Sequence, residues 1–171
     1  FAGGGTGGHI YPGLAVADAF RSLAEKDGIS VKICWIGCSS GMDRTIVERN
    51  TDENGRRSAD IFYGIPAGKL RRYISFRNCI DIFKVLAGFF ASFAILAKMR
   101  PAVLFSKGGF VSVPPCAAAK LLRIPVYTHE QTAIPGLTNK VIDKFCKKIF
   151  ISFAESARYF AVKKTILTGN P

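Results

Sequence analysis

The amino-acid sequence predicts one α/β domain built on a doubly wound parallel sheet, and three observations lead to this prediction. Short apolar segments alternate with segments of helical length along the chain, the pattern of strand–helix–strand units. The 171 residues, 49% of them hydrophobic, are enough to bury one sizeable core. Chemically unusual loops follow three of the expected strands, and open parallel sheets bind ligands at the carboxyl ends of their strands. We therefore treat residues 1–171 as a single domain.

Hydrophobic periodicity defines the expected elements in order. Apolar residues at helical spacing from Leu14 to Ala24 predict the first helix, which Asp27-Gly28 ends. The segment 40–43 resembles a capping box and predicts a short helix running to about Arg49. The other elements follow from apolar runs bounded by polar turns. Strands are expected at 1–2, 31–37, 59–63, 103–105, 125–128, 148–151 and 165–167, and further helices at 80–98, 113–122, 137–146 and 154–160.

Charge and cysteine content limit the classes of partner and site. With 24 basic and 12 acidic residues the net charge is +12, which favours anionic partners: nucleic acid, acidic lipid or phosphorylated small molecules. The five cysteines lack the spacing of zinc ligands and are typical of buried free thiols in a reducing compartment. We expect neither a metal nor a cofactor. Because the chain stops abruptly at Gly169-Asn170-Pro171, we expect it to be a piece of a longer protein.

The strongest functional signal is the segment Gly3-Gly4-Gly5-Thr6-Gly7-Gly8-His9, directly ahead of the first helical pattern. Glycines let main-chain N–H groups approach a ligand closely. A helix N-terminus adds unpaired N–H donors and the positive end of the helix dipole. A tight turn without a ligand needs one or two glycines, and packing does not explain five. The loop therefore predicts a site for phosphate or diphosphate.

Two common nucleotide-binding motifs do not fit this loop. The dinucleotide fingerprint requires an acidic residue about 20 positions further on, but Ile36-Gly37-Cys38-Ser39 stands at the end of the second strand. A phosphate-binding P-loop requires Gly-Lys-Ser/Thr, and His9-Ile10 occupies that place. NAD and ATP are therefore disfavoured as ligands.

His9 ends the glycine-rich loop at the mouth of the expected site. Its imidazole could act as a general base on a hydroxyl nucleophile, a role worth about 10²–10⁴-fold in rate. The structural alternative is a histidine that only hydrogen-bonds loop carbonyls or caps the helix. No Gly-x-Ser-x-Gly or Cys/His/Asn arrangement is present in the sequence, so acyl-transfer chemistry finds no support.

Two further loops follow strands on the same expected rim. Gly108-Gly109-Phe110 follows the strand at 103–105, with Lys107 available for a phosphate and Phe110 able to stack on a sugar or line a lipid groove. Taken alone, that segment would more often be a plain turn. His129-Glu130 ends the strand at 125–128, and Glu130 could orient a hydroxyl or the other histidine.

A basic and aromatic stretch suggests a second functional surface. Interleaved cations and bulky apolar groups suit an anionic membrane surface or single-stranded nucleic acid, and the structural alternative is a solvated loop. The uncharged run 85–97, between Lys84 and Lys98, falls short of the roughly 20 residues that cross a bilayer. It should pack on the sheet, dip into a membrane, or do both with different faces. The membrane candidates are Lys69, Leu70, Arg71, Arg72, Tyr73, Ile74, Phe76 and Arg77.

Five segments together resemble the MurG family, the bacterial N-acetylglucosaminyltransferases that make lipid II from lipid I for peptidoglycan. They are 3–12, 105–112, 129–131, 135–140 and 168–171. The resemblance covers the whole chain but only the amino-terminal half of such an enzyme. It implies a metal-independent GT-B glycosyltransferase, with two Rossmann-like domains across a cleft. This half would bind lipid I at the cytoplasmic face of the bacterial inner membrane, and the other half would hold most of the UDP-N-acetylglucosamine.

The resemblance also implies roles for individual residues. His9 would be the base of an inverting transfer to the 4-hydroxyl of the muramic acid residue, with Glu130 as helper or alternative base. Thr132 stands where most relatives have asparagine, and its hydroxyl could still hydrogen-bond the donor substrate, UDP-N-acetylglucosamine. Phe110 stands where many relatives have tyrosine, so no phenol acts there. The implied substrate-binding residues are Thr6, Gly7, Gly8, Gly108, Gly109, Phe110, His129, Thr132 and Asn139.

Two alternative functions remain open from the sequence. The chain could be a non-catalytic acceptor-binding and membrane-anchoring subunit of a split glycosyltransferase. Nucleic-acid binding rests on charge alone and gives no role to the glycine-rich loops, so we expect no nucleic-acid partner. The expected partners are UDP-N-acetylglucosamine, lipid I and an anionic phospholipid surface.

Overall fold

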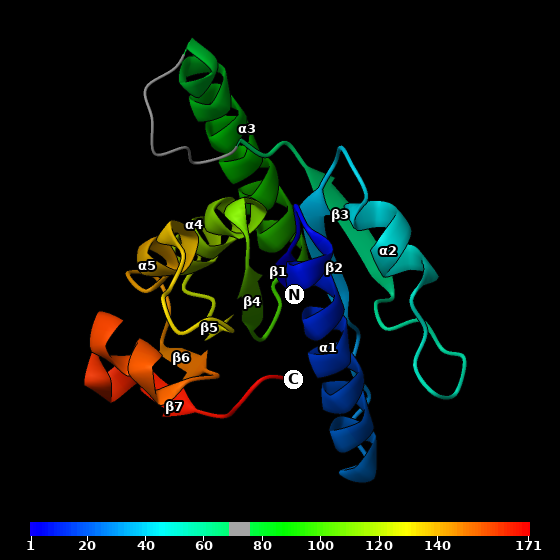
Figure 1. Cartoon of the computed structure of the whole chain (residues 1–171). Coiled ribbons are helices and arrows are strands. Elements are labelled where there is room, and N and C mark those ends of the chain that lie inside the picture. Colours follow the sequence, from blue (N-terminus) through cyan, green and yellow to red (C-terminus); the bar gives the residue numbers. More distant parts are fainter. Residues whose placement is uncertain (69–75) are drawn as a thin grey trace.

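The computed structural model describes residues 1–68 and 76–171, with side chains for 1–68 and 81–171 (Figure 1). Seven parallel strands form one sheet in the order β3-β2-β1-β4-β5-β6-β7. The order runs outward from β1 in both directions, which confirms the predicted doubly wound sheet. The strands are β1 (Ala2–Gly3), β2 (Cys34–Cys38), β3 (Ile61–Ile65), β4 (Leu104–Gly108), β5 (Val126–Glu130), β6 (Lys148–Ile151) and β7 (Thr165–Leu167).

Helices cover both faces of the sheet (Figure 1). One core packs α1 and α2 against the sheet, and the other packs α3, α4 and α5 against the opposite face. The helices are α1 (Gly7–Lys26), α2 (Asp43–Arg49), α3 (Phe76–Met99), α4 (Val113–Leu121) and α5 (Leu137–Ile142), with 3₁₀ turns at Phe110–Ser112, Ala154–Tyr159 and Val162–Lys164.

Strand β2 shows why its sequence is apolar throughout. Successive strand residues point to opposite faces of a sheet. Trp35 is fully buried in the core beneath α1, and Ile36 is buried in the core beneath α3 and α4. Both faces of the strand are thus covered, which is the condition that favours continuous apolar runs over alternating ones.

Several helix boundaries differ from the expected ones. The predicted capping box is wrong, because Met42 precedes α2 and makes no side-chain cap, while the Asp43 carboxylate bonds to loops outside its own helix. Helix α1 begins at Gly7, so the end of the glycine-rich loop is already helical. Helix α3 begins earlier than expected, at Phe76. Helix α5 ends at Ile142, and the segment expected as a helix at 154–160 is a 3₁₀ turn.

Four cysteines are described with their side chains. Cys38, Cys116 and Cys146 are buried free thiols, and Cys34 is half-buried. Burial raises the pKa of the Cys116 thiol to about 12 and that of Cys146 to about 11, so both are protonated near pH 7. Within the described part of the chain, no cluster of three or more His, Cys, Asp or Glu side chains could hold a metal ion.

Candidate active site

The candidate site lies where the strand order reverses. The carboxyl ends of β1 and β4 form this topological switch point, the usual ligand crevice of doubly wound sheets. The loops after these strands touch, because a Cβ added to Gly109 would overlap the carbonyl oxygen of Gly4 and lie 3.2 Å from His9 Cδ2. The loop after β5 reaches the same place, since a Cβ on Gly8 would lie 3.9 Å from Nε2 of Gln131. The three loops singled out in the sequence therefore meet at one rim.

The glycines of the first loop fall into two groups. A Cβ on Gly4 would overlap the Asp43 carboxylate, and one on Gly5 would overlap the Phe110 ring. Gly5 also has a φ of +83°, a conformation that favours glycine. A Cβ on Gly7 or Gly8 would make only ordinary van der Waals contacts, at 3.4 and 3.9 Å from the nearest atoms. The expectation that packing explains none of these glycines is therefore wrong for Gly4 and Gly5, and Gly7-Gly8 remain for close approach of a ligand.

Gly7-Gly8 form an open first turn of α1. Thr6 precedes the helix in an extended conformation without a side-chain cap, and no acidic residue lies in the first turn. The amide of His9 donates to the Thr6 carbonyl at 3.1 Å. Thr6 and Gly8 are exposed, so the amides of Gly7-Gly8 sit at the surface of the rim. The positive end of the helix dipole and these donors favour an anion there.

His9 is held in one tautomer by a main-chain carbonyl. Its Nδ1 lies 3.3 Å from the carbonyl oxygen of Lys107, which only accepts, so Nδ1 carries the proton and Nε2 has the free lone pair. The pKa of this half-buried imidazole is lowered, chiefly by burial and also by the charge of Lys107. The hydrogen bond to the Lys107 carbonyl and the charge of Glu130 act in the opposite direction. The ring is therefore neutral near pH 7 and can accept a proton at Nε2.

Lys107 is not available to a phosphate, contrary to the expectation. The residue is 1% exposed, and its Nζ lies 2.6 Å from Nδ1 of His129. Because an ammonium only donates, Nδ1 of His129 accepts, and its Nε2–H donates to the carbonyl of Gly169 at 3.0 Å. Burial lowers the pKa of Lys107 to about 8. Burial is also the largest cause of the lowered pKa of His129. Both ring nitrogens of His129 are thus engaged within the protein.

Glu130 is the centre of a buried network. The residue is 3% exposed; Oε1 accepts from the amide and hydroxyl of Thr132 at 2.9 and 2.7 Å, and Oε2 accepts from Nδ2 of Asn139 at 2.8 Å. A Cβ on Gly108 would lie 3.2 Å from Oδ1 of Asn139, so the network also supports the loop after β4. Its occupied oxygens favour His9 over Glu130 as a base. Thr132 itself is exposed at the rim.

Phe110 forms part of the wall of a cavity beside the first loop. Gly108 and Gly109 ahead of it have φ values of +87° and +80°, which direct the chain sharply into the following 3₁₀ turn. The cavity holds about 320 Å³ and lies between the loop after β1, the loop after β2 and α3. Its lining includes Gly5, Ser40, Asp81, Lys84 and Phe110. The cavity therefore adjoins the loop after β1 at Gly5, two residues before α1 begins, and the side of α3.

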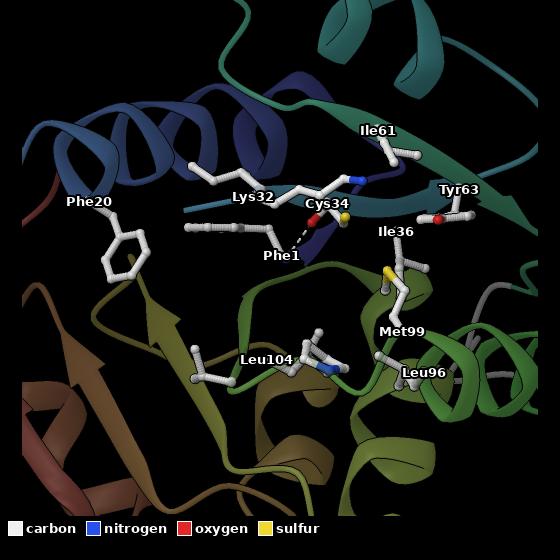
Figure 2. Close-up of a pocket in the computed structure, with 13 residues that line it drawn as sticks. Phe1, Phe20, Lys32, Cys34, Ile36, Ile61, Tyr63, Leu96, Met99 and Leu104 are labelled. Carbon is white, nitrogen blue, oxygen red and sulfur yellow. Dashed lines mark hydrogen bonds between the residues drawn. The ribbon is translucent and has the colours of Figure 1, made fainter. Parts of the chain in front are cut away.

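A second cavity lies at the opposite end of the strands. Figure 2 shows this cavity of about 410 Å³, which is lined by Phe1, Phe20, Tyr63, Leu96 and Met99 among others. Its residues come from the start of the chain, from α1, from β2, β3 and β4 with the segments before them, and from the last turns of α3. The site chemistry described above is absent from this lining, and ligands of such sheets bind at the carboxyl ends. We therefore assign the functional site to the rim.

Asp43 is a site residue that the sequence analysis missed. Its carboxylate is buried and accepts from the amide of Gly5 at 3.0 Å and from the amide of Cys38 at 2.8 Å. It therefore ties the loop after β1 to the carboxyl end of β2. Its position at the start of a helix suggested local capping, and no local signal pointed to a partner 38 residues away.

The expected membrane surface is described only in part. Lys69, Leu70, Arg71, Arg72, Tyr73 and Ile74 lie outside the described residues, as do the side chains of Phe76 and Arg77 in α3. The described part of α3 buries Gly88, Ser92 and Leu96 and exposes an apolar face. The exposed residues are Ile82, Phe83, Leu86 and Phe90.

Helix α3 is also the one described helix long and apolar enough, by length and composition alone, to cross a membrane. Its buried face packs against the rest of the domain, since a Cβ on Gly88 would contact Pro114 of α4 at 3.5 Å. Its amino-terminal end projects away from the sheet (Figure 1). The helix thus packs on the domain with one face and presents a second, apolar face outward, while contact of that face with a membrane stays a prediction.

Known proteins match the chain in sequence and in fold. The Glycosyltransferase family 28 N-terminal domain matches residues 1–151. The UDP-N-acetylglucosamine--N-acetylmuramyl-(pentapeptide) pyrophosphoryl-undecaprenol N-acetylglucosamine transferases of Treponema denticola and Borreliella burgdorferi are 55% and 41% identical over the whole chain. The chain covers 43% and 44% of these two proteins. It therefore spans less than half the length of the curated relatives it matches.

Solved structures agree with this assignment. MurG of Acinetobacter baumannii superposes with a TM-score of 0.70 at 26% identity, over 100% of this chain and 44% of that protein. UDP-GlcNAc 2-epimerase of Methanocaldococcus jannaschii superposes with a TM-score of 0.65 at 15% identity, over 99% of this chain and 44% of that protein. This likeness shows a shared fold alone. The resemblance found in the sequence is thus confirmed. The chain belongs to glycosyltransferase family 28, of which it forms an amino-terminal domain.

Proposed function

We propose that this chain is the acceptor-binding half of an enzyme that transfers N-acetylglucosamine from UDP-N-acetylglucosamine to lipid I, forming lipid II. The names of the relatives support the reaction, and the rim supports the role of this half. The observation that carries the proposal is the His9 ring in the first turn of α1, whose Nδ1–H is fixed by a carbonyl and whose Nε2 makes no hydrogen bond within the described part of the chain. No metal or cofactor is needed for the step described next.

The proposed reaction is an inverting displacement. The 4-hydroxyl oxygen of the muramic acid residue attacks the anomeric carbon of the donor sugar, while His9 Nε2 takes the hydroxyl proton. The bond from that carbon to the diphosphate oxygen breaks, and UDP leaves with the electron pair. The negative charge on the leaving diphosphate requires fixed donors. The resemblance assigns most of these donors to the other half of the enzyme, because the amides of Gly7-Gly8 are taken by the acceptor and the Thr132 hydroxyl already donates to Glu130 Oε1.

The acceptor can be placed by the same geometry. Its diphosphate fits the amides at the start of α1, and the cavity lined by Phe110 and Lys84 offers space for the group attached to it. His129, Asn139 and the glycine pair after β4 act indirectly in this arrangement, by fixing the loops around the acceptor.

The lipid portion of the acceptor requires contact with a membrane. The face of α3 supports this, because Phe83 and Phe90 are 72% and 67% exposed and Lys84 lies between them in sequence. Aromatic rings insert at a bilayer interface, and each nearby cation adds about 1 kcal/mol on an anionic surface. We therefore place the protein on the cytoplasmic face of the bacterial inner membrane, attached peripherally.

Substitution of His9 in the whole native protein tests the proposed chemistry. His9→Asn keeps an N–H donor for the Lys107 carbonyl but has no basic nitrogen. We expect kcat to fall by about 10²–10⁴-fold, with the Kd of UDP-N-acetylglucosamine little changed. A loss confined to KM would remove His9 from the base role. Full activity of the variant would favour the alternative of a non-catalytic subunit whose partner supplies the base.

The membrane proposal is tested by sedimentation with vesicles that contain phosphatidylglycerol. The double variant Phe83→Ser, Phe90→Ser should bind at least about tenfold more weakly, since each buried ring contributes roughly 1.5 kcal/mol or more. Leu23→Ser is the control, because Leu23 is 61% exposed but lies on α1. Equal losses in both variants, or none in the double variant, would contradict a role for α3.

A further inference from the structure

The side chain of Lys107 has no part in the mechanism above, although it is almost completely buried. Among the described residues, no carboxylate lies within ion-pairing distance of its ammonium. A buried cation with no carboxylate in contact, on which Glu130 acts only from beyond ion-pairing distance, is costly and calls for an explanation. The contacts of its side chain and of its main chain provide one.

The side chain of Lys107 fixes the hydrogen bonds at the end of β5. Its Nζ donates to Nδ1 of His129 at 2.6 Å, which forces the proton of the ring onto Nε2. That proton is donated to the Gly169 carbonyl at 3.0 Å, and the hydroxyl of Ser152 lies 3.3 Å from the same oxygen. One buried ammonium thus connects β4, β5 and the segment that follows β7.

The main chain of Lys107 fixes His9. The carbonyl oxygen that holds His9 Nδ1 belongs to the residue whose ammonium contacts His129. The backbone at this point is closely surrounded, since a Cβ on Gly3 or on Gly13 would lie 3.4 Å from the Lys107 Cβ. A shift of β4 at Lys107 would therefore move the carbonyl that orients the His9 ring.

We propose that Lys107 is a positioning residue for the base: its buried ammonium, bonded to His129, holds β4 so that its own carbonyl directs Nε2 of His9 toward the substrate. This inference rests on the proposed function, because it assigns the role of base to His9. Nothing in the contact requires the ammonium to touch substrate, and its burial prevents it.

Electrostatics give the proposal a second readout besides the rate, namely the pKa of His9. The groups that act on the titration of His9 are the Lys107 ammonium and carbonyl from β4 and the Glu130 carboxylate from β5. The ammonium lowers the pKa of His9, whereas the carbonyl and the carboxylate raise it. Removing only the ammonium should therefore raise the pKa of His9 and move the acidic limb of the kcat/KM profile to higher pH.

The test uses Lys107→Met in the whole native protein. We expect kcat to fall by up to about 100-fold through misplacement of the base, with KM for UDP-N-acetylglucosamine nearly unchanged. The acidic limb of the kcat/KM profile should move to higher pH. An NMR titration of His9 without substrate should show the same rise in the pKa. Lys107→Arg keeps a charged donor and should leave the limb in place. Lys120→Met removes an exposed charge at the end of α4 and should have no effect.

Several outcomes would overturn the proposal. A folded Lys107→Met protein with the kcat and pH profile of the native protein would do so. If methionine prevents folding, Lys107→Gln keeps a neutral donor, and an unshifted titration of His9 in that variant would have the same force. If the native protein transfers no sugar, the proposed function fails, while the titration of His9 without substrate still decides whether Lys107 acts on it.

Discussion

The loop after β1 and the loop after β4 are both rich in glycine, yet their glycines meet different surroundings. In the loop after β4, Gly108 and Gly109 have positive φ, and a Cβ on either would press against Asn139 or overlap the Gly4 carbonyl. In the loop after β1, Gly4 and Gly5 are similarly enclosed, but Gly7-Gly8 are not. The two loops thus share a structural role, and only the first also presents glycines at which a Cβ would make ordinary contacts.

This difference shows where ligand chemistry can be located. A glycine that the fold requires says little about a ligand, because the fold excludes a side chain there whether or not a ligand binds. A glycine with free space at an uncapped helix N-terminus has no such structural reason. The open pair Gly7-Gly8, beside the free Nε2 of His9, is therefore the part of the rim best suited to an anion.

The largest expected difference between the loops is in stability. Gly109→Ala should lower the free energy of unfolding by about 3 kcal/mol, since alanine is strained at this φ and its Cβ would overlap backbone. Gly8→Ala should change it by less than about 1 kcal/mol, because the position is helical and open. Urea denaturation of both variants measures the contrast. Equal destabilisation would show that the two loops do not differ.

A smaller effect is expected at the anchor of the first loop. Asp43→Asn keeps one accepting oxygen and replaces the other by an NH₂, which is brought against the amide of Gly5 or of Cys38, a donor that needs an acceptor. The variant should lose about 2 kcal/mol of stability. Asp27→Asn, at the exposed end of α1, is the control. A stability equal to that of the control would mean that the loop holds its shape without the carboxylate.

The smallest effect concerns pH and the two histidines of these loops. Burial is the main cause lowering the pKa of both His9 and His129 below 6.5. Below that pH the unfolded chain binds more protons than the folded one, so stability should be lost as pH falls from about 7 to 5. The loss should be smaller in His129→Gln, as followed by the Tm across this range. A Tm difference between variant and native chain that is constant with pH would contradict the titration of His129.

Local sequence patterns account for the fold and for the position of the rim. The alternation of apolar runs and helical periodicity leads to a parallel sheet, and the unusual loops mark the carboxyl ends of its strands. The family resemblance follows from short motifs that keep their order along the chain. These features depend on neighbouring residues, which is why they can be recognised without coordinates.

What each residue does at the rim was decided by tertiary structure. The pattern Ser-Lys-Gly-Gly offered Lys107 to a ligand, but the strand order brings its ammonium to His129 and its carbonyl to His9. Likewise Asp43 resembled a helix cap and instead holds Gly5 across the sheet. Such partners lie tens of residues apart, so their pairing depends on strand order and burial rather than on local spacing. Sequence alone therefore predicted where the candidate site lies, and the packing of distant segments selected which of its groups are engaged within the protein.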